Sequence, residues 1–193
     1  MKKAELRQIY LEKRSGIHAE DHADLSQNIA EKFFDELNIR QIGSVHCFIS
    51  LEHRGEVETE HIFERLWRDF PHIQTFAPRV DHESGEMAAL PYSRDTRLEQ
   101  NRWHILEPSD GERADPSVID VVVVPLLCFD GRGHRVGYGK GYYDRFLKKC
   151  RPDCIKAGLS FFPPVERIDD IHEGDLALDI CVTPSRIFRF SPI

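Results

Sequence analysis

The 193-residue sequence lacks a long apolar run and lacks a cysteine framework. No stretch approaches the roughly 18 consecutive apolar residues of a membrane-spanning helix. The start, MKKAELRQIYLEKR, has no apolar core behind its two lysines, so it does not resemble a secretory signal. The five cysteines are odd in number and form no CxxC, which indicates reduced, mostly buried thiols. We therefore expect a cytoplasmic protein with no membrane partner.

Positive charge is also scarce. The chain has 26 Lys and Arg against 33 Asp and Glu, a formal net charge of -7. This balance argues against charge-driven binding to nucleic acid or to an anionic membrane. Its length and its 40% hydrophobic content suffice for one substantial core, so we expect residues 1–193 to form a single domain.

Apolar patterning predicts an α/β fold. We expect helices over residues 3–14, 18–37, 59–70 and 141–150. We expect strands over residues 44–50, 73–80, 87–93, 118–129, 154–161 and 176–183. The run VVVV within 118–129 is typical of a strand that is covered on both faces, as in parallel sheets. The alternation of strands and helices predicts a three-layer α/β/α sandwich with a largely parallel central sheet.

The stretch GRGHRVGYGKGYYDRF, residues 131–146, lies between the strongest predicted strand and a predicted helix. Open α/β sheets bind ligands at this place, beyond the carboxyl ends of their strands. Glycines let backbone N–H groups approach an anion, and a helix start adds a positive dipole end. The residues of such a phosphate site are Gly137, Gly139 and Gly141, with Arg135 and Lys140 for charge.

Two better-known phosphate loops are excluded by spacing. A P-loop ending at Gly139 and Lys140 needs Gly in place of His134 and Ser or Thr in place of Gly141. A dinucleotide-binding loop needs Gly in place of Tyr142. No HExxH and no GxSxG is present, so nothing indicates a zinc protease or a nucleophile elbow. From the residues alone, a phosphate loop and a merely structural glycine-rich turn both remain open.

The same stretch resembles a known family. GHRVGYGKGYYDRF is similar to the signature G-x-R-L-G-x-G-x-G-Y-Y-D of the 5-formyltetrahydrofolate cyclo-ligases, with Val136 for Leu as its one departure. The motifs KAELR, FISLEHRGEVET, APRV, WHILEP and DLALDICVTP match the same family in order. The resemblance spans nearly all of residues 3 to 184.

The resemblance implies an ATP- and Mg²⁺-dependent ligase that closes 5-formyltetrahydrofolate to 5,10-methenyltetrahydrofolate. It implies ATP-binding roles for Lys3, Arg7, Arg135, Gly137, Tyr138, Gly139, Lys140, Gly141, Tyr142 and Tyr143. It implies folate-binding roles for Ile49, Glu56 and Tyr142. Catalytic roles go to Arg135, Lys140 and Tyr142, and magnesium-binding roles go to Asp144 and Asp179.

Several alternatives stay open at this stage. The shared helix face of Lys3, Arg7 and Arg14 is either a phosphate contact or a solvated basic stripe. Trp103 either covers a ligand or belongs to the core, and Asp175 is either a ligand or a turn residue. A non-catalytic folate- or nucleotide-binding protein is the alternative function, and an RNA-associated protein is disfavoured by the net charge. We expect a monomer or a weak homodimer.

Overall fold

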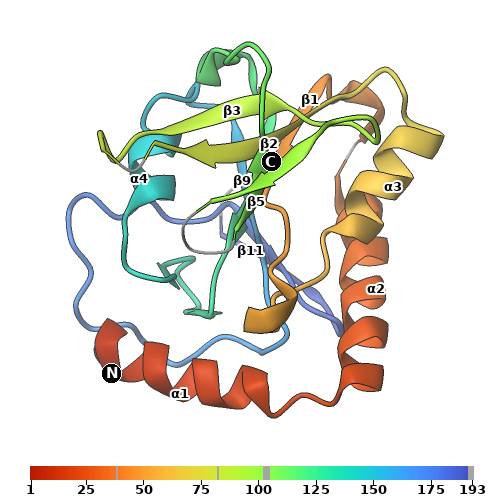
Figure 1. Cartoon of the computed structure of the whole chain (residues 1–193). Coiled ribbons are helices and arrows are strands. Elements are labelled where there is room, and N and C mark those ends of the chain that lie inside the picture. Colours follow the sequence, from red (N-terminus) through yellow and green to blue (C-terminus); the bar gives the residue numbers. More distant parts are fainter. Residues whose placement is uncertain (38, 82, 102–104, 191–193) are drawn as a thin grey trace.

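A computed structural model describes residues 1–37, 39–81, 83–101 and 105–190 (Figure 1). Its centre is a seven-stranded sheet in the order β11-β10-β9-β6-β1-β2-β3. These strands are β1 (Ser44–Cys47), β2 (Gln74–Val80), β3 (Met87–Pro91), β6 (Val121–Pro125), β9 (Ile155–Leu159), β10 (Ile180–Val182) and β11 (Ile187–Arg189).

Strands β2, β1, β6, β9 and β10 pair in parallel, and only the edge strands β3 and β11 pair antiparallel within this sheet. The predicted largely parallel sheet is thus confirmed. The strand order proceeds in opposite directions from β1 and from β6, which makes the gap between their carboxyl ends the topological switch point. Open α/β sheets bind their ligands at such a point.

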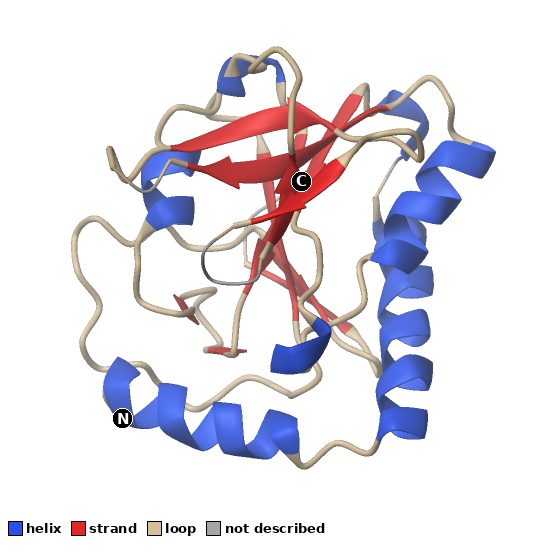
Figure 2. Ribbon diagram, viewed as in Figure 1, coloured by secondary structure: helices blue, strands red, loops and turns tan. Residues whose placement is uncertain are grey.

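Helices cover both faces of the sheet, which confirms the three layers (Figure 2). Helices α2 (Ala19–Glu36) and α3 (Glu60–Asp69) cover one face, and their apolar stripes join Val45, Val123 and Ile180 in one core. The short helix α4 (Tyr142–Leu147) packs on the other face with Val122 and Val124. Since α4 is six residues long, the second helical layer is much thinner than the first.

Helix α1 (Lys3–Ser15) lies across the carboxyl ends of β1 and β6, at the bottom of Figure 1. It packs on the hairpin of β7 (Cys128–Phe129) and β8 (Arg135–Val136), where Leu6 and Tyr10 share a small core with Val136. Helix α1, which carries basic residues on one face, therefore covers the switch point at the carboxyl ends of the strands.

Several short elements escape the sequence prediction. The predicted strand 118–129 is β6 followed by β7, because the chain leaves the sheet after Pro125 to form the β7–β8 hairpin. Strands β4 (Leu98–Gln100) and β5 (Leu106–Pro108) form a separate pair in a segment that the sequence leaves irregular. The 3-10 turns are η1 (Ile39–Gln41), η2 (Glu52–Arg54) and η3 (Pro116–Val118). Trp103 lies outside the described residues. None of the helices in the described part of the chain is long and apolar enough to cross a membrane.

Candidate active site

The first half of the glycine loop is a hairpin that is pinned by a fully buried carboxylate. Asp130 Oδ1 accepts the backbone N–H of Arg132 at 3.0 Å and that of His134 at 3.2 Å. Its Oδ2 accepts the Arg132 guanidinium at 2.6 Å and the N–H of Ile168 at 3.2 Å. Burial alone would raise the pKa of Asp130, but these hydrogen bonds outweigh burial and lower it. Sequence analysis missed Asp130, although the turn signal Asp-Gly marks its position.

The second half of the loop is open. Gly137 lies against the carboxyl end of β6, with its Cβ position 3.8 Å from the carbonyl oxygen of Pro125. Gly139 and Gly141 have φ angles of 84° and 68°, in the left-handed region that favours glycine. Lys140 between them is exposed. The loop therefore presents backbone and one cation at the carboxyl end of β6, as a phosphate site requires.

The basic face of α1 points at this loop and is not a solvated stripe. Arg7 Nε donates to the carbonyl of Gly137 at 2.9 Å, and Arg14 is 6% exposed. Lys3 forms an ion pair with Asp175. Asp175 is thus a partner of the basic face, a role that sequence analysis left undecided.

Glu56, just beyond η2, is the buried carboxylate of the site and is 5% exposed. Its Oε2 accepts the N–H of Leu51 at 3.0 Å, and its Oε1 accepts the hydroxyl of Tyr138. Burial raises the pKa of the Glu56 carboxyl, while the hydrogen bonds from Tyr138 and Leu51 oppose the shift. Ile49, two residues beyond the end of β1, is half-buried near this corner of the chain.

The side chain of Tyr138 reaches from the glycine loop to Glu56 and Arg14. Besides donating to Glu56, its hydroxyl accepts a hydrogen bond from Arg14 at 2.6 Å. The guanidinium carbons of Arg54 and Arg14 lie 4.9 Å and 5.7 Å from its ring centroid. In this structure the side chain of Tyr138 therefore contacts the Glu56 corner of the site. Its contact with ATP, which the family resemblance implies, stays a prediction.

Two carboxylates predicted to hold metal have separate basic partners. Asp144 Oδ1 accepts the Arg135 guanidinium at 2.8 Å and the N–H of Leu176 at 3.2 Å. Asp179 precedes β10 and accepts both the backbone N–H and the Nζ of Lys156, at 2.8 Å and 2.6 Å. Asp144 thus lies beside the loop, while Asp179 lies at the amino end of its strand. Within the described ranges, no group of three or more His, Cys, Asp and Glu side chains is placed to hold a metal ion.

Arg135 and the two tyrosines form the wall behind the loop. The Arg135 side chain is 7% exposed, and its donors reach Asp144 and the carbonyl of Leu176. Tyr142 is half-exposed, with the Arg145 guanidinium 5.2 Å from its ring centroid. The hydroxyl of Tyr143 is enclosed and has no hydrogen-bond partner among the described residues. Arg135 is therefore held by Asp144 and Leu176, whereas the hydroxyl of Tyr143 is left without a partner in the described part of the chain.

His46 on β1 lies beneath this wall and was not predicted as a site residue. It is fully buried, and its ring centroid is 4.9 Å from that of Phe146 and 6.1 Å from that of Tyr143. Burial lowers the pKa of His46 to about 3, so the imidazole is neutral at physiological pH.

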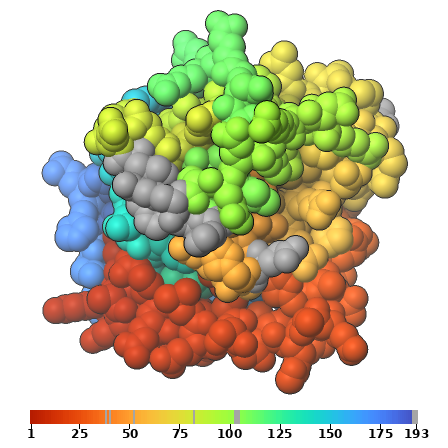
Figure 3. Space-filling view, viewed as in Figure 1, coloured from red at the N-terminus to blue at the C-terminus, as the bar shows by residue number. Residues whose placement is uncertain are grey.

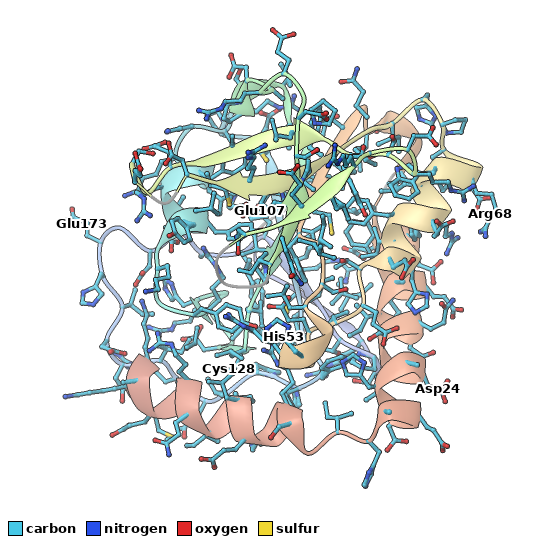
Figure 4. All side chains as sticks on the ribbon, viewed as in Figure 1. Asp24, His53, Arg68, Glu107, Cys128 and Glu173 are labelled. Atoms are coloured by element: carbon cyan, nitrogen blue, oxygen red, sulfur yellow. The ribbon has the colours of Figure 1, made fainter. Side chains whose placement is uncertain are left out.

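A cavity of about 760 Å³ opens beside Tyr138, between α1, the start of α2 and η2. Its lining includes Arg14, His53 and Arg54. Figure 4 shows His53 on η2, close above α1. Figure 3 shows the same edge from outside, with α1 in red along the bottom and the orange residues that follow β1 above it. This cavity therefore has room for a ligand next to Tyr138, which contacts Glu56.

Comparison with known proteins decides the family. The model of the 5-formyltetrahydrofolate cyclo-ligase family matches residues 1–183. The chain belongs to the 5-formyltetrahydrofolate cyclo-ligase family. Its members are ATP-dependent ligases of folate one-carbon metabolism, and the chain is an enzyme of this class.

Similar cyclo-ligases are found in distant organisms. The 5-formyltetrahydrofolate cyclo-ligase of Escherichia coli (strain K12) is 29% identical over 187 residues, which cover 93% of this chain and 98% of that protein. The protein of the same name from Saccharomyces cerevisiae is 30% identical over 189 residues, 86% of this chain and 85% of that protein. The solved structure of Aquifex aeolicus 5,10-methenyltetrahydrofolate synthetase superposes with a TM-score of 0.84 at 28% identity and covers 100% of this chain and 95% of that one.

Proposed function

We propose that this cyclo-ligase family member converts 5-formyltetrahydrofolate and ATP to 5,10-methenyltetrahydrofolate, ADP and phosphate with the help of Mg²⁺. The observation that carries the proposal is the direct contact between Tyr138 of the glycine loop and the buried carboxylate of Glu56. A phosphoryl transfer from nucleotide to folate needs the two substrates in neighbouring sites. A phosphate loop in contact with a pterin-binding carboxylate meets that need.

The reaction begins with activation of the formyl oxygen, which is a poor leaving group. The formyl oxygen attacks the γ-phosphorus of ATP, and ADP departs, leaving an imino-phosphate on the folate. N10 then attacks the formyl carbon, phosphate leaves with the former formyl oxygen, and N10 loses its proton. The protein's part is positioning and neutralisation of charge, since neither step needs a protein nucleophile.

The nucleotide side consists of the loop backbone and its cations. Lys140 is exposed on the loop, and Arg7 already lies on the Gly137 carbonyl, so both reach phosphate oxygens with small movements. Lys3 does so by leaving its ion pair with Asp175. Arg135 orients Asp144 and stabilises the loop's end of the site. Gly139, Gly141 and Tyr143 complete the ATP-binding set.

The folate side consists of Glu56, Ile49 and Tyr142. A carboxylate accepts a pair of hydrogen bonds from the aminopyrimidine edge of a pterin, which is the role we propose for Glu56. Ile49 and the ring of Tyr142 offer apolar surface to the pterin and the adjoining ring. Tyr142 lies between both substrates because it follows the loop directly.

The donor set beside the loop fits a magnesium ion that arrives with the nucleotide. Mg²⁺ prefers one or two carboxylates together with phosphate oxygens, and it neutralises the charge of the transferring phosphoryl group. Arg135 and Leu176 both donate to Oδ1 of Asp144, and the Asp144 side chain is 27% exposed. We propose Asp144 as the metal ligand, and Asp179 stays a prediction. Asp144→Asn should shift the Mg²⁺ titration of activity to higher concentration; a titration that matches the parent protein would remove the assignment.

We also propose that residues 1–193 act as one domain in the cytoplasm, as a monomer or a weak homodimer. Among the described residues, only four large apolar side chains are exposed, which is few for a large apolar interface: Met1 before α1, Leu11 on α1, Leu106 on β5 and Val118 in η3. The molar mass measured by light scattering during size-exclusion chromatography tests this proposal. A tight dimer at micromolar concentration would contradict it.

The first experiment is the absorbance of methenyltetrahydrofolate after mixing the purified protein with 5-formyltetrahydrofolate and Mg-ATP. We expect a rise that disappears when ATP is omitted. No rise, with folate binding still measurable by calorimetry, would favour the non-catalytic binding protein.

A further inference from the structure

The carboxylate proposed to receive the pterin is covered in this structure. Glu56 is 5% exposed, and its two oxygens are occupied by Leu51 and by the hydroxyl of Tyr138. A pterin cannot donate a pair of hydrogen bonds to a carboxylate that has almost no accessible surface. Since Leu51 uses its backbone, Tyr138 is the group that can leave.

Tyr138 is part of the glycine loop proposed to bind nucleotide, but its hydroxyl contacts Glu56, the residue proposed to bind folate. Its neighbours are Gly137, whose carbonyl accepts from Arg7 Nε at 2.9 Å, and Gly139, whose Cβ position is 3.1 Å from Arg7 Nη2. A movement of Arg7 therefore changes the contacts of both glycines that flank Tyr138. A shift of Tyr138, in turn, changes the hydrogen bond between its hydroxyl and Glu56.

The surroundings of Tyr138 keep its hydroxyl protonated, so that it donates to Glu56, and leave an open cavity beside its ring. Burial, together with the charge of Glu56, raises the pKa of Tyr138, so its hydroxyl keeps its proton at neutral pH. The cavity of about 760 Å³ is lined by Tyr138 itself and by Arg14 and Arg54. Both guanidiniums already lie near the Tyr138 ring, at 5.7 Å and 4.9 Å from its centroid, so a ring that turns toward the cavity stays within reach of a cation–π contact.

We propose that Tyr138 is a removable cap on Glu56 that couples the nucleotide loop to folate binding. A triphosphate is a stronger acceptor for Arg7 than the neutral Gly137 carbonyl, so nucleotide binding withdraws Arg7 from the loop. The loop then releases Tyr138 into the cavity and uncovers Glu56. By linkage, each substrate tightens the binding of the other by the same factor. This inference rests on the proposed function, because it takes folate as the ligand of Glu56.

The test is Tyr138→Phe, which keeps the ring and removes the hydroxyl. Calorimetry gives the Kd of 5-formyltetrahydrofolate with and without a non-hydrolysable ATP analogue. In the parent protein we expect the analogue to tighten folate binding by roughly tenfold, within the usual range of coupling between sites. In Tyr138→Phe we expect folate alone to bind about as tightly as it does to the parent with nucleotide, and the coupling factor to fall to about one.

Tyr92→Phe is the matched control, because the ring of Tyr92 packs against Phe63 and Trp67 of α3. It should keep the parent's Kd values and coupling. Hydrogen exchange gives a second readout that does not depend on activity. Folate alone should change the exchange of the amides of residues 137–141 in the parent and leave it unchanged in Tyr138→Phe.

The outcomes separate this inference from the function on which it rests. Equal coupling in the parent and in Tyr138→Phe would overturn the cap while folate binding by the parent still supports the proposed function. A parent protein that binds no 5-formyltetrahydrofolate, with or without the analogue, would overturn both. Loss of coupling in Tyr138→Phe alone, and not in Tyr92→Phe, supports the cap.

Discussion

The two halves of the glycine loop differ in what holds them. Residues 131–136 form a hairpin over the buried carboxylate of Asp130, and Gly133 is packed so closely that a Cβ would lie 2.9 Å from the carbonyl oxygen of Leu178. Within residues 137–141, Gly139 and Gly141 face the ends of flexible side chains instead, namely Arg7 at Gly139 and Arg145 at Gly141, and Gly139 and Lys140 are exposed. We call them the anchored half and the open half.

The comparison shows that glycines in one loop serve two purposes. In the anchored half, Gly133 permits close packing against the chain that enters β10. In the open half, Gly139 and Gly141 give positive φ angles and leave backbone free for a ligand. Substitutions in the anchored half should therefore reduce stability, and substitutions in the open half should reduce activity.

Lys140→Ala should have the largest effect and should affect activity alone. Removal of one cation from a phosphoryl-transfer site is expected to lower kcat/KM by about 10²–10³-fold. Because Lys140 is exposed, the Tm should stay within about 1 °C of the parent's. Lys149→Ala is the control, since Lys149 is an exposed lysine just beyond the carboxyl end of α4 and pairs with Glu86, which precedes β3. Kinetics close to the parent's for Lys140→Ala would contradict the phosphate role of the open half.

Asp130→Asn should show the opposite pattern. An NH2 group in place of Oδ2 removes the acceptor of both the Ile168 N–H and the Arg132 guanidinium, so we expect a loss of about 3 kcal/mol in the free energy of unfolding by urea. The pKa of Asp130 is lowered in the folded state, so its stabilisation is present above its unfolded pKa and is lost as the pH falls through the folded one. The variant should lose less stability than the parent below about pH 4. A change smaller than 1 kcal/mol at pH 7 would mean that Asp130 does not anchor the hairpin.

His46→Leu tests the support beneath the open half, because His46 packs against Phe146 and Tyr143 of α4. The folded pKa of about 3 lies below the unfolded value, so the unfolded chain binds the proton first as the pH falls. Between pH 7 and pH 5 this costs the parent about 2 kcal/mol of stability. Urea unfolding at both pH values should show that this difference shrinks in the variant. An equal difference in both proteins would mean that His46 is not the acid-sensitive group.

Sequence patterns predicted the long elements and the charged face well. The predicted helix 3–14 corresponds to α1 (Lys3–Ser15), since apolar and basic side chains repeat at helical spacing over several turns. The run of four valines predicted β6 (Val121–Pro125), because four β-branched residues in succession are typical of a strand that is covered on both faces. The basic face of α1 meets the open half of the loop through Arg7, a contact that sequence analysis left open beside a solvated stripe.

Very short strands and contacts between distant segments could not be predicted from the sequence. Strands β7 and β8 have two residues each, too few for any periodicity. The contact of Tyr138 with Glu56 spans 82 residues, and a tyrosine between two glycines gives no sign of where its side chain points. Asp130 lies in an ordinary Asp-Gly turn, and its anchoring role depends on Ile168 from another part of the chain. Pairing between distant segments decided each of these cases.

Gly139→Ala should give the smallest effect and therefore the finest comparison of the two halves. At a φ of 84°, a Cβ costs roughly 1 kcal/mol, and the Arg7 guanidinium 3.1 Å away can yield because it ends a flexible side chain. We expect a small loss of stability and an increase of severalfold in the KM for ATP, since the strained backbone moves the amides that face phosphate. Gly131→Ala in the anchored half is the matched control, because its Cβ position has no atom within 4 Å. If both variants raised the KM for ATP equally, the division of the loop into an anchored half and an open half would be wrong.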